Sequence, residues 1–66
     1  MNTFFSLTIR SKKEEYIGLF SSLASALETG RALEGIYQIP YTIVVSEWLW
    51  NDKWEYIDTR IEEEVE

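Results

Sequence analysis

The chain has 66 residues, of which 45% are hydrophobic and 15% aromatic, and its formal net charge is −6 at pH 7. It contains no Cys and no His, which excludes a disulfide, the usual zinc sites, a catalytic thiol and an imidazole base. No apolar run approaches the roughly 18–20 residues of a membrane span. The cations near the N-terminus follow the apolar stretch instead of preceding it, unlike those of a signal peptide, so we expect one cytoplasmic domain, residues 1–66.

The first predicted element is a strand over residues 3–10. Phe5, Leu7 and Ile9 alternate with polar residues there, which is the period of a strand with one buried face.

The second predicted element is an amphipathic helix over residues 12–29. Ser11 followed by Glu14 matches a capping box, so Ser11 is the predicted N-cap. Gly30 is the predicted C′ residue that ends the helix. Apolar residues recur at steps of four, three and four, which is the pattern of one buried helix face: Tyr16, Phe20, Leu23 and Leu27.

Residues 30–40 are predicted to form a connection. Gly35 and Pro40 interrupt regular structure there. Whether residues 31–34 extend the helix or form a separate turn stays open at this stage.

A hairpin is predicted over residues 41–61. Two segments rich in β-branched and aromatic residues, 41–50 and 54–61, flank a polar loop at 51–53. The acidic tail at 62–66 either extends the last strand or frays.

The resulting fold class is α+β with the order β-α-β-β. We expect one amphipathic helix packed on a three-stranded, mainly antiparallel sheet with a C-terminal β-hairpin. The strand order stays open, because the first strand could lie beside either arm of the hairpin.

A three-residue hairpin loop assigns the hairpin residues to two faces. One face is mostly aliphatic and suits packing under the helix; it pairs Leu49 with Glu55, Glu47 with Ile57, Val45 with Thr59 and Ile43 with Ile61. The other face, away from the helix, pairs Trp50 with Trp54, Trp48 with Tyr56, Ser46 with Asp58 and Val44 with Arg60. The aromatic residues are open to three interpretations: core, homodimer interface, or binding surface for another protein.

Charge is distributed unevenly along the chain. Residues 1–33 hold four Lys/Arg against three Glu, whereas residues 34–66 hold two Lys/Arg against nine Asp/Glu and all three tryptophans. Such an acidic half is either ordinary solubility charge or an attractor for a basic groove. In the second interpretation the predicted partner-binding residues are the aromatic anchors Trp48, Trp50, Trp54 and Tyr56 and the carboxylates Glu55, Asp58, Glu62, Glu63 and Glu64.

Little in the sequence indicates catalysis, a metal site or a cofactor. A cross-strand pair of Glu47 and Glu55 is the one enzymatic option, and a solvated acidic pair is far commoner, so we expect no enzyme. We also expect no direct nucleic-acid binding, since phosphate contacts need cations and only Arg10, Lys12 and Lys13 cluster.

The chain resembles, at class level, the small inhibitors that bacteriophages encode against host machinery: anti-CRISPR proteins, antirestriction proteins and RNA-polymerase inhibitors. The resemblance lies in an acidic chain of this size without Cys or His and in the element pattern over Thr3–Arg10, Ser11–Thr29, Tyr41–Trp50 and Trp54–Ile61. It includes no motif, so it carries over no residue role. It implies a DNA-mimic-like inhibitor, in the bacterial cytoplasm, of a host protein with a basic, nucleic-acid-binding surface. The alternative is a small homodimeric antitoxin- or adaptor-like protein.

Overall fold

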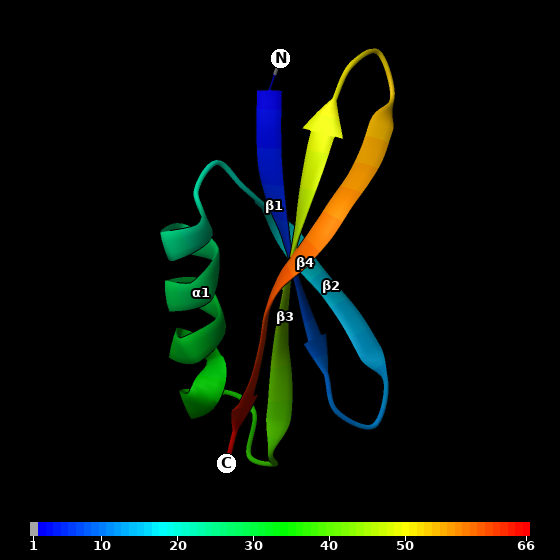
Figure 1. Cartoon of the computed structure of the whole chain (residues 1–66). Coiled ribbons are helices and arrows are strands. Elements are labelled where there is room, and N and C mark those ends of the chain that lie inside the picture. Colours follow the sequence, from blue (N-terminus) through cyan, green and yellow to red (C-terminus); the bar gives the residue numbers. More distant parts are fainter. Residues whose placement is uncertain (1) are drawn as a thin grey trace.

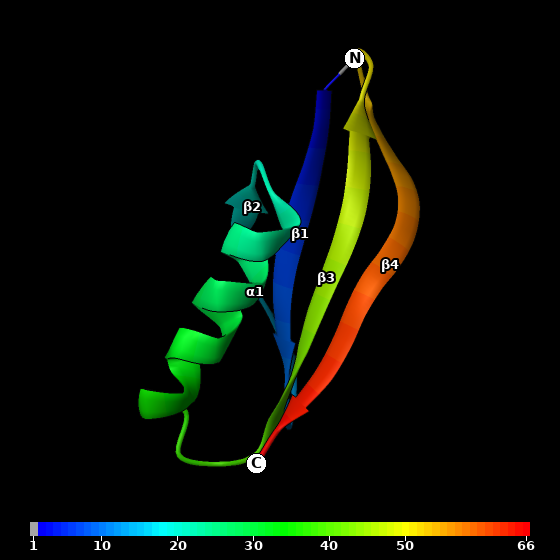
Figure 2. The same ribbon diagram turned by 60° about the vertical axis from the view of Figure 1, so that its left-hand side comes forward.

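A computed structural model describes residues 2–66 and contains one antiparallel sheet with one α-helix on one of its faces (Figures 1 and 2). The strand order in the sheet is β2-β1-β3-β4. In chain order the elements are β1 (Asn2–Arg10), β2 (Glu14–Phe20), α1 (Leu23–Ala32), the 3-10 turn η1 (Leu33–Gly35), β3 (Tyr41–Trp50) and β4 (Trp54–Val65). The α+β class is confirmed, but the sheet has four strands instead of three, and two strands precede the helix instead of one.

The prediction of a helix over residues 12–29 is wrong in its first half, because residues 14–20 form β2. This strand pairs with β1 through the partners Leu19 and Ser6 on one side of the sheet and Phe20 and Phe5 on the other. A bulge opposite Leu7 and Thr8 places one extra residue in β2. The extra residue breaks the alternation of β2, and the apolar positions then imitate a helical period.

The predicted helix ends are also displaced. The N-cap of α1 is Ser22, whose side-chain oxygen accepts a hydrogen bond from the Ser25 amide at 3.1 Å. Ser11 instead lies in the β1–β2 turn, where its amide donates to the carbonyl of Lys13 at 3.1 Å. At the other end the helix continues through residues 31–32, and η1 follows directly, which settles the question left open for residues 31–34.

The prediction that Gly30 ends the helix is wrong. Gly30 lies in the last turn of α1 and is buried. A Cβ at this position would lie 2.9 Å from Cγ2 of Ile43, so the absence of a side chain lets the helix approach β3 closely. The hydroxyl of Tyr41 donates to the Gly30 carbonyl at 2.9 Å, which ties the same helix turn to the start of β3.

The core lies between α1 and the sheet and contains no tryptophan. Its buried members come from the inward positions of β1 and β3 and from the helix: Leu7, Ile9, Ala26, Tyr41, Ile43 and Val45. Partly buried residues of β2, β4 and the segment after the helix, such as Ile17, Ile61 and Tyr37, pack around them. The helix therefore covers one face of the sheet, and the opposite face carries no element of residues 2–66.

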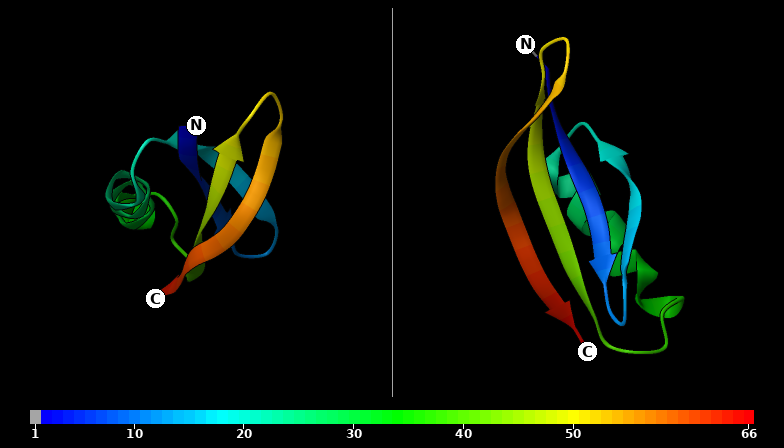
Figure 3. Two further views of the ribbon diagram at one scale, coloured as in Figure 1. Left: turned by 45° about the horizontal axis from the view of Figure 1, so that its top comes forward. Right: turned by 90° about the vertical axis from the view of Figure 1, so that its right-hand side faces the viewer.

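The β3–β4 hairpin, prominent in Figure 3, has the predicted three-residue turn. In this turn Asp52 adopts a positive φ of 63°, which Asp tolerates better than most residues. The strands pair Trp50 with Trp54, Trp48 with Tyr56 and Leu49 with Glu55, as predicted.

Two irregularities in β4 make the rest of the predicted register wrong. Asp58 lies opposite Glu47 instead of Ser46, and Ser46 lies opposite Thr59. Farther on, Ile61 lies opposite Val45. Each bulge adds one residue to β4 and shifts every later pair by one position. Alternation within one strand does not reveal such a shift, so it could not predict which residues of β3 and β4 lie opposite each other. The acidic tail is not frayed along most of its length, since β4 continues to Val65.

Candidate functional site: the open face of the sheet

The sheet face opposite α1, here called the open face, gathers aromatic and apolar side chains at one of its ends. Strand alternation places Trp48 and Trp50 of β3 on this face, because Ile43 and Val45 point into the core. The same reasoning places Phe4 of β1 there. We call the whole group the aromatic patch; it consists of Phe4, Tyr16, Leu19, Trp48, Trp50, Trp54 and Tyr56.

The rings of the aromatic patch contact one another across three strands. The ring centroids of Trp50 and Trp54 lie 4.9 Å apart, and those of Trp48 and Tyr56 lie 5.4 Å apart at 72°. Trp54 also meets Phe4 at 5.5 Å and 75°. Since Trp54 belongs to the edge strand β4 and Phe4 to β1, the Trp54 indole extends over β3. Edge-on contacts of this kind are favourable and hold the rings in defined positions.

Much of the aromatic patch is nevertheless in contact with solvent. Trp50 is 41% exposed, Trp54 is 45% exposed and Tyr16 is 62% exposed. Trp48 is more sheltered, and its indole N–H donates to the hydroxyl of Ser6 at 2.9 Å. Large exposed rings in a contiguous group are unusual for a surface without a partner.

Two open hollows lie within the aromatic patch and share Leu19 and Trp54, which form a ridge between them. The first hollow has a volume of about 420 Å³ and is lined by Phe4, Leu19, Phe20, Ser21, Trp50 and Trp54. The second hollow has a volume of about 380 Å³ and is lined by Ser6, Thr8, Tyr16, Leu19, Trp48 and Trp54. Together they make a corrugated surface that can take side chains of a ligand.

The predicted partner-binding carboxylates do not lie among the rings. Glu55 and Asp58 are paired with Leu49 and Glu47, whose positions in β3 point to the helix side of the sheet. The guanidinium of Arg60 holds the acids on that side, at 2.6 Å from Glu47 and 3.6 Å from Asp58. The earlier assignment of Asp58 and Arg60 to the face of the tryptophans is therefore wrong, and the β4 bulges are the cause.

The three glutamates near the end of β4 alternate between the two faces. Glu62 and Glu64 lie on the open face, opposite Val44 and Thr42, at the end away from the rings. Thr42 and Trp48 are six positions apart in β3, or about 20 Å at the rise of a strand. Glu62 accepts a hydrogen bond from Arg10 at 3.1 Å.

Glu63 points to the helix side and forms a bidentate pair with Arg31, with both N···O distances at 2.7 Å. The hydrogen bonds from Arg31 lower the pKa of the Glu63 carboxyl, and the same pair raises the pKa of Arg31. This carboxylate serves to fasten β4 to the helix, so it is not free for a partner's cation.

Two tyrosines fasten the segment after the helix on the same side. The hydroxyl of Tyr37 donates to the Glu15 carboxylate, and this hydrogen bond raises the pKa of Tyr37. Burial raises the pKa of Tyr41, whose ring lies 5.2 Å from that of Tyr37.

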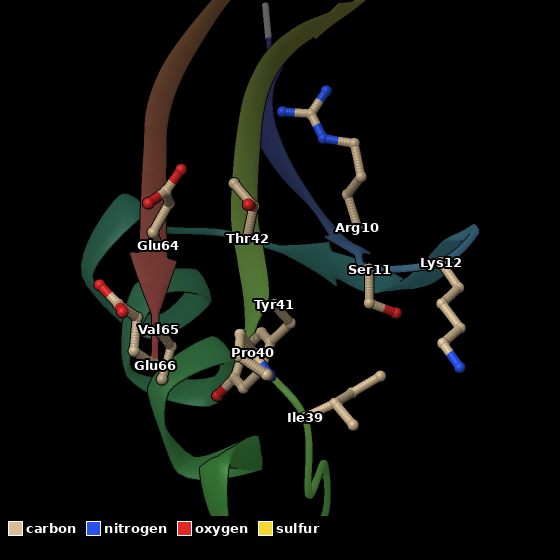
Figure 4. A pocket seen from close by; sticks show the side chains of 10 residues that line it. All are labelled: Arg10, Ser11, Lys12, Ile39, Pro40, Tyr41, Thr42, Glu64, Val65 and Glu66. Atoms are coloured by element: carbon tan, nitrogen blue, oxygen red, sulfur yellow. The ribbon is translucent and has the colours of Figure 1, made fainter.

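A further open cavity of about 500 Å³ lies at the end of the sheet away from the aromatic patch (Figure 4). Its floor is apolar, and its walls carry charges of opposite sign. Figure 4 shows Lys12 directed away from Glu64 and Glu66, while Arg10 is already bonded to Glu62. The lining residues are Arg10, Ser11, Lys12, Ile39, Pro40, Tyr41, Thr42, Glu64, Val65 and Glu66. None of them forms a set that could transfer a proton or activate a nucleophile.

The chain matches no protein-family model, no curated protein and no solved structure. Over residues 2–66, no group of three or more Asp or Glu side chains is arranged to hold a metal ion. In the same part of the chain, no helix has the length and apolar character needed to cross a membrane.

Sequence reasoning missed three members of the aromatic patch. Phe4 has the strand parity opposite to that of Phe5, Leu7 and Ile9, which are predicted to face the core, so this signal was available. Tyr16 and Leu19 were assigned to a helix, and only the pairing of β2 with β1 reveals that they lie beside Trp54.

Proposed function

We propose that this chain is a non-catalytic, phage- or mobile-element-encoded inhibitor that binds a host nucleic-acid-handling protein through the aromatic patch, with its acidic charge directed to a basic surface of that partner. The observation that carries the proposal is the contrast between a core that contains no tryptophan and an open face on which Trp50, Trp54 and Tyr56 remain exposed.

The alternative that these rings merely complete the core has little support. The helix-side core is closed without them by aliphatic residues, by Tyr41 and by the partly buried Phe5, Phe20 and Tyr37. From their exposed fractions, the rings and Leu19 leave roughly 400–500 Å² of mainly apolar surface in water. That is as large as the largest patch on a typical monomer, and such patches are often functional. Trp and Tyr are also the residues that dominate interface energies.

The acidic charge supports a basic protein partner. The net charge is −6, and all three arginines are engaged by carboxylates within the chain. Because the acids lie along β4 and its turn and not among the rings, their expected role is to steer and orient the partner over a distance. A continuous row of charge that imitates phosphates at the ring contact is not needed for this role.

A nucleic-acid ligand is less consistent with the same charges. Of the three lysines, Lys12 and Lys13 lie in the β1–β2 turn, at the far end of the sheet from the tryptophans. Only Lys53 lies in the turn beside the patch, whereas phosphate contacts normally need several cations.

The test is capture of the partner followed by a functional assay. The immobilised domain is exposed to a bacterial extract, and the captured protein is identified, purified and tested for nucleic-acid binding with and without the domain. We expect the domain to block that binding, and Trp54→Ser to abolish both capture and blocking. Ile36→Ser is the matched control, because Ile36 is 72% exposed and lies in the connection after η1.

The result that overturns the proposal is a captured protein whose nucleic-acid binding is unchanged at saturating domain concentration. A capture that is insensitive to Trp54→Ser but lost in Ile36→Ser would place the binding surface elsewhere.

The second candidate is a homodimer in which two open faces cover each other, as in small antitoxin- or adaptor-like proteins. The exposed rings favour it, since aromatic residues are enriched in protein interfaces and the core of a homodimer interface is more apolar than the rest of the surface. Sedimentation at micromolar concentration decides: a dimer that becomes a monomer in Trp54→Ser supports this candidate, and a wild-type monomer contradicts it.

A further inference from the structure

Two of the three indole N–H groups in the aromatic patch are available to a ligand. The N–H of Trp48 is used within the protein, since it donates to Ser6. Over residues 2–66, the N–H groups of Trp50 and Trp54 make no hydrogen bond to the protein, and both residues are more than 40% exposed. A ligand that fits here should therefore offer hydrogen-bond acceptors as well as apolar surface.

The two hollows of the aromatic patch have a definite spacing. The first includes Phe4 of β1, and the second includes Ser6 and Thr8 of the same strand. On β3 the first hollow includes Trp50 and the second Trp48, two residues apart, and on β1 the mean offset is three residues, so the centres lie about 7–10 Å apart. A polyproline II segment rises about 3.1 Å per residue with three residues per turn, so its positions i and i+3 project to the same side about 9 Å apart.

A helix, an added strand and a polyproline II segment differ in whether their backbone carbonyls can accept hydrogen bonds at this face. A helix has its carbonyls engaged internally, so it cannot accept from both Trp50 and Trp54 except at its end. An added strand needs the edge of a sheet, whereas these rings lie on a face. A polyproline II segment has no internal hydrogen bonds, and its carbonyls are free acceptors.

Charge adds a second requirement. The aromatic patch belongs to a chain with a net charge of −6; the turn that joins Trp50 and Trp54 carries both Asp52 and Lys53, so the negative field comes from the carboxylates along β4. A ligand segment with Lys or Arg beside its apolar residues is attracted by this field. Exposed indole faces also favour cations from the ligand.

We propose that the aromatic patch binds an extended, proline-rich segment that carries Lys or Arg, with apolar side chains three residues apart in the two hollows and its carbonyls accepting from the indole N–H groups of Trp50 and Trp54. This inference rests on the proposed function, for which it names the part of the partner that is bound.

A second copy of the chain fits the same face less well. Each copy provides roughly 400–500 Å² from its exposed rings and Leu19, below the ~800 Å² per partner of a standard interface. Two copies also bring together two net charges of −6. A peptide segment needs less buried area than a second copy does. Its Lys or Arg residues also bring positive charge to this negatively charged chain, where a second copy would bring more negative charge.

The experiment is a titration of the purified domain with short synthetic peptides, followed by the tryptophan fluorescence. Since all three tryptophans lie in the aromatic patch, their emission reports its occupation. The first peptide has prolines three residues apart and flanking arginines. The second replaces the prolines by alanines, which favours a helix, and the third replaces the arginines by glutamates.

We expect saturable binding of the first peptide with a blue-shifted emission, and at least about tenfold weaker binding of the other two. Raising the salt from about 50 mM to about 500 mM should weaken the first peptide further. Trp54→Phe keeps a ring but removes the N–H, so we expect about fivefold weaker binding. Trp50→Phe should behave alike, and Ile36→Ser should bind as the wild type does.

Equal binding of the alanine peptide would overturn the proposal in favour of a helical occupant. Emission changes with single-stranded oligonucleotides but with none of the peptides would overturn it in favour of nucleobases. A wild-type dimer by sedimentation that dissociates in Trp54→Ser would assign the face to a second copy.

If no peptide binds but the captured partner is still inhibited, this inference alone fails. If the proline peptide binds but the captured partner is not inhibited, only the proposed function fails.

Discussion

The two faces of the sheet use different kinds of hydrophobic residue. The centre of the helix-side face is mainly aliphatic, and Leu7, Ile9, Ile43 and Val45 are fully buried there or nearly so, beside the buried Tyr41. The open face is aromatic, and its rings remain partly in water. Branched aliphatic side chains pack closely against α1. Flat rings with polar edges can instead contact water, and a ligand can replace that water. The contrast indicates that the first face maintains the fold and the second is available for binding.

The largest effect is expected on the helix side, at the centre of the core. Ile43→Ala removes a side chain that is 0% exposed and contacts the helix at Gly30. The loss of burial and the cavity left behind should lower the free energy of unfolding by about 2–5 kcal/mol. Urea unfolding followed by circular dichroism measures it. An unchanged midpoint would mean that the helix does not pack on β3.

A smaller loss is expected from adding a methyl group at the helix–sheet contact. Gly30→Ala places a Cβ 2.9 Å from the fully buried side chain of Ile43, and overpacking of this kind costs about 1–3 kcal/mol. Gly35→Ala is the matched control, because nothing lies within 4 Å of a Cβ there. Its expected effect is neutral or a stabilisation of about 0.4–1 kcal/mol. Equal destabilisation by both substitutions would contradict the close helix approach at Gly30.

The open face should respond in the opposite way, with a small effect on stability and a large one on binding. Trp54→Ser removes two ring contacts, with Phe4 and with Trp50, each worth about 0.5–1.5 kcal/mol beyond the area that the ring buries, and nearly half of Trp54 is already in solvent. Thermal unfolding should therefore change only modestly, while binding of the partner is lost. Complete unfolding of this variant would show that the rings belong to the fold, and the contrast between the two faces would fail.

The smallest effect concerns the pair of Arg31 and Glu63, which fastens β4 to the helix. Because Arg31 lowers the pKa of Glu63 in the folded state, the pair stabilises above the unfolded pKa of a Glu. This contribution is lost as the pH falls through the lower, folded pKa. Arg31→Gln should therefore reduce stability slightly at neutral pH and leave it unchanged at a pH where Glu63 is protonated. The measurement is the urea midpoint as a function of pH.

The raised pKa values of Tyr37 and Tyr41 give stability the opposite dependence on pH. Unfolded tyrosines ionise first as the pH rises, so the stability that these two contribute is complete below their ordinary pKa of 10.0 and is lost as the pH rises through the higher, folded values. Replacing Tyr37 by Phe should weaken the alkaline loss of stability. An alkaline limb that is identical in this variant would exclude Tyr37 as a source.

Local sequence signals were sufficient for β1 and for the hairpin turn. Alternation identified Leu7 and Ile9 as inward residues, and a polar three-residue loop placed Trp50 opposite Trp54. These signals act between residues close in sequence, so they can be recognised without the rest of the chain. The same alternation correctly placed the three tryptophans on the face away from the helix.

By itself, then, the sequence determined the α+β class, the acidic charge, the C-terminal hairpin and the side of the sheet on which the rings project. Only the tertiary structure decided that residues 14–20 form a strand, that Gly30 lies beneath Ile43, and that Asp58 leaves the face of the rings. The reason is that a bulge, an edge pairing and a close helix contact depend on residues far apart in the chain. Local periodicity contains no information about them.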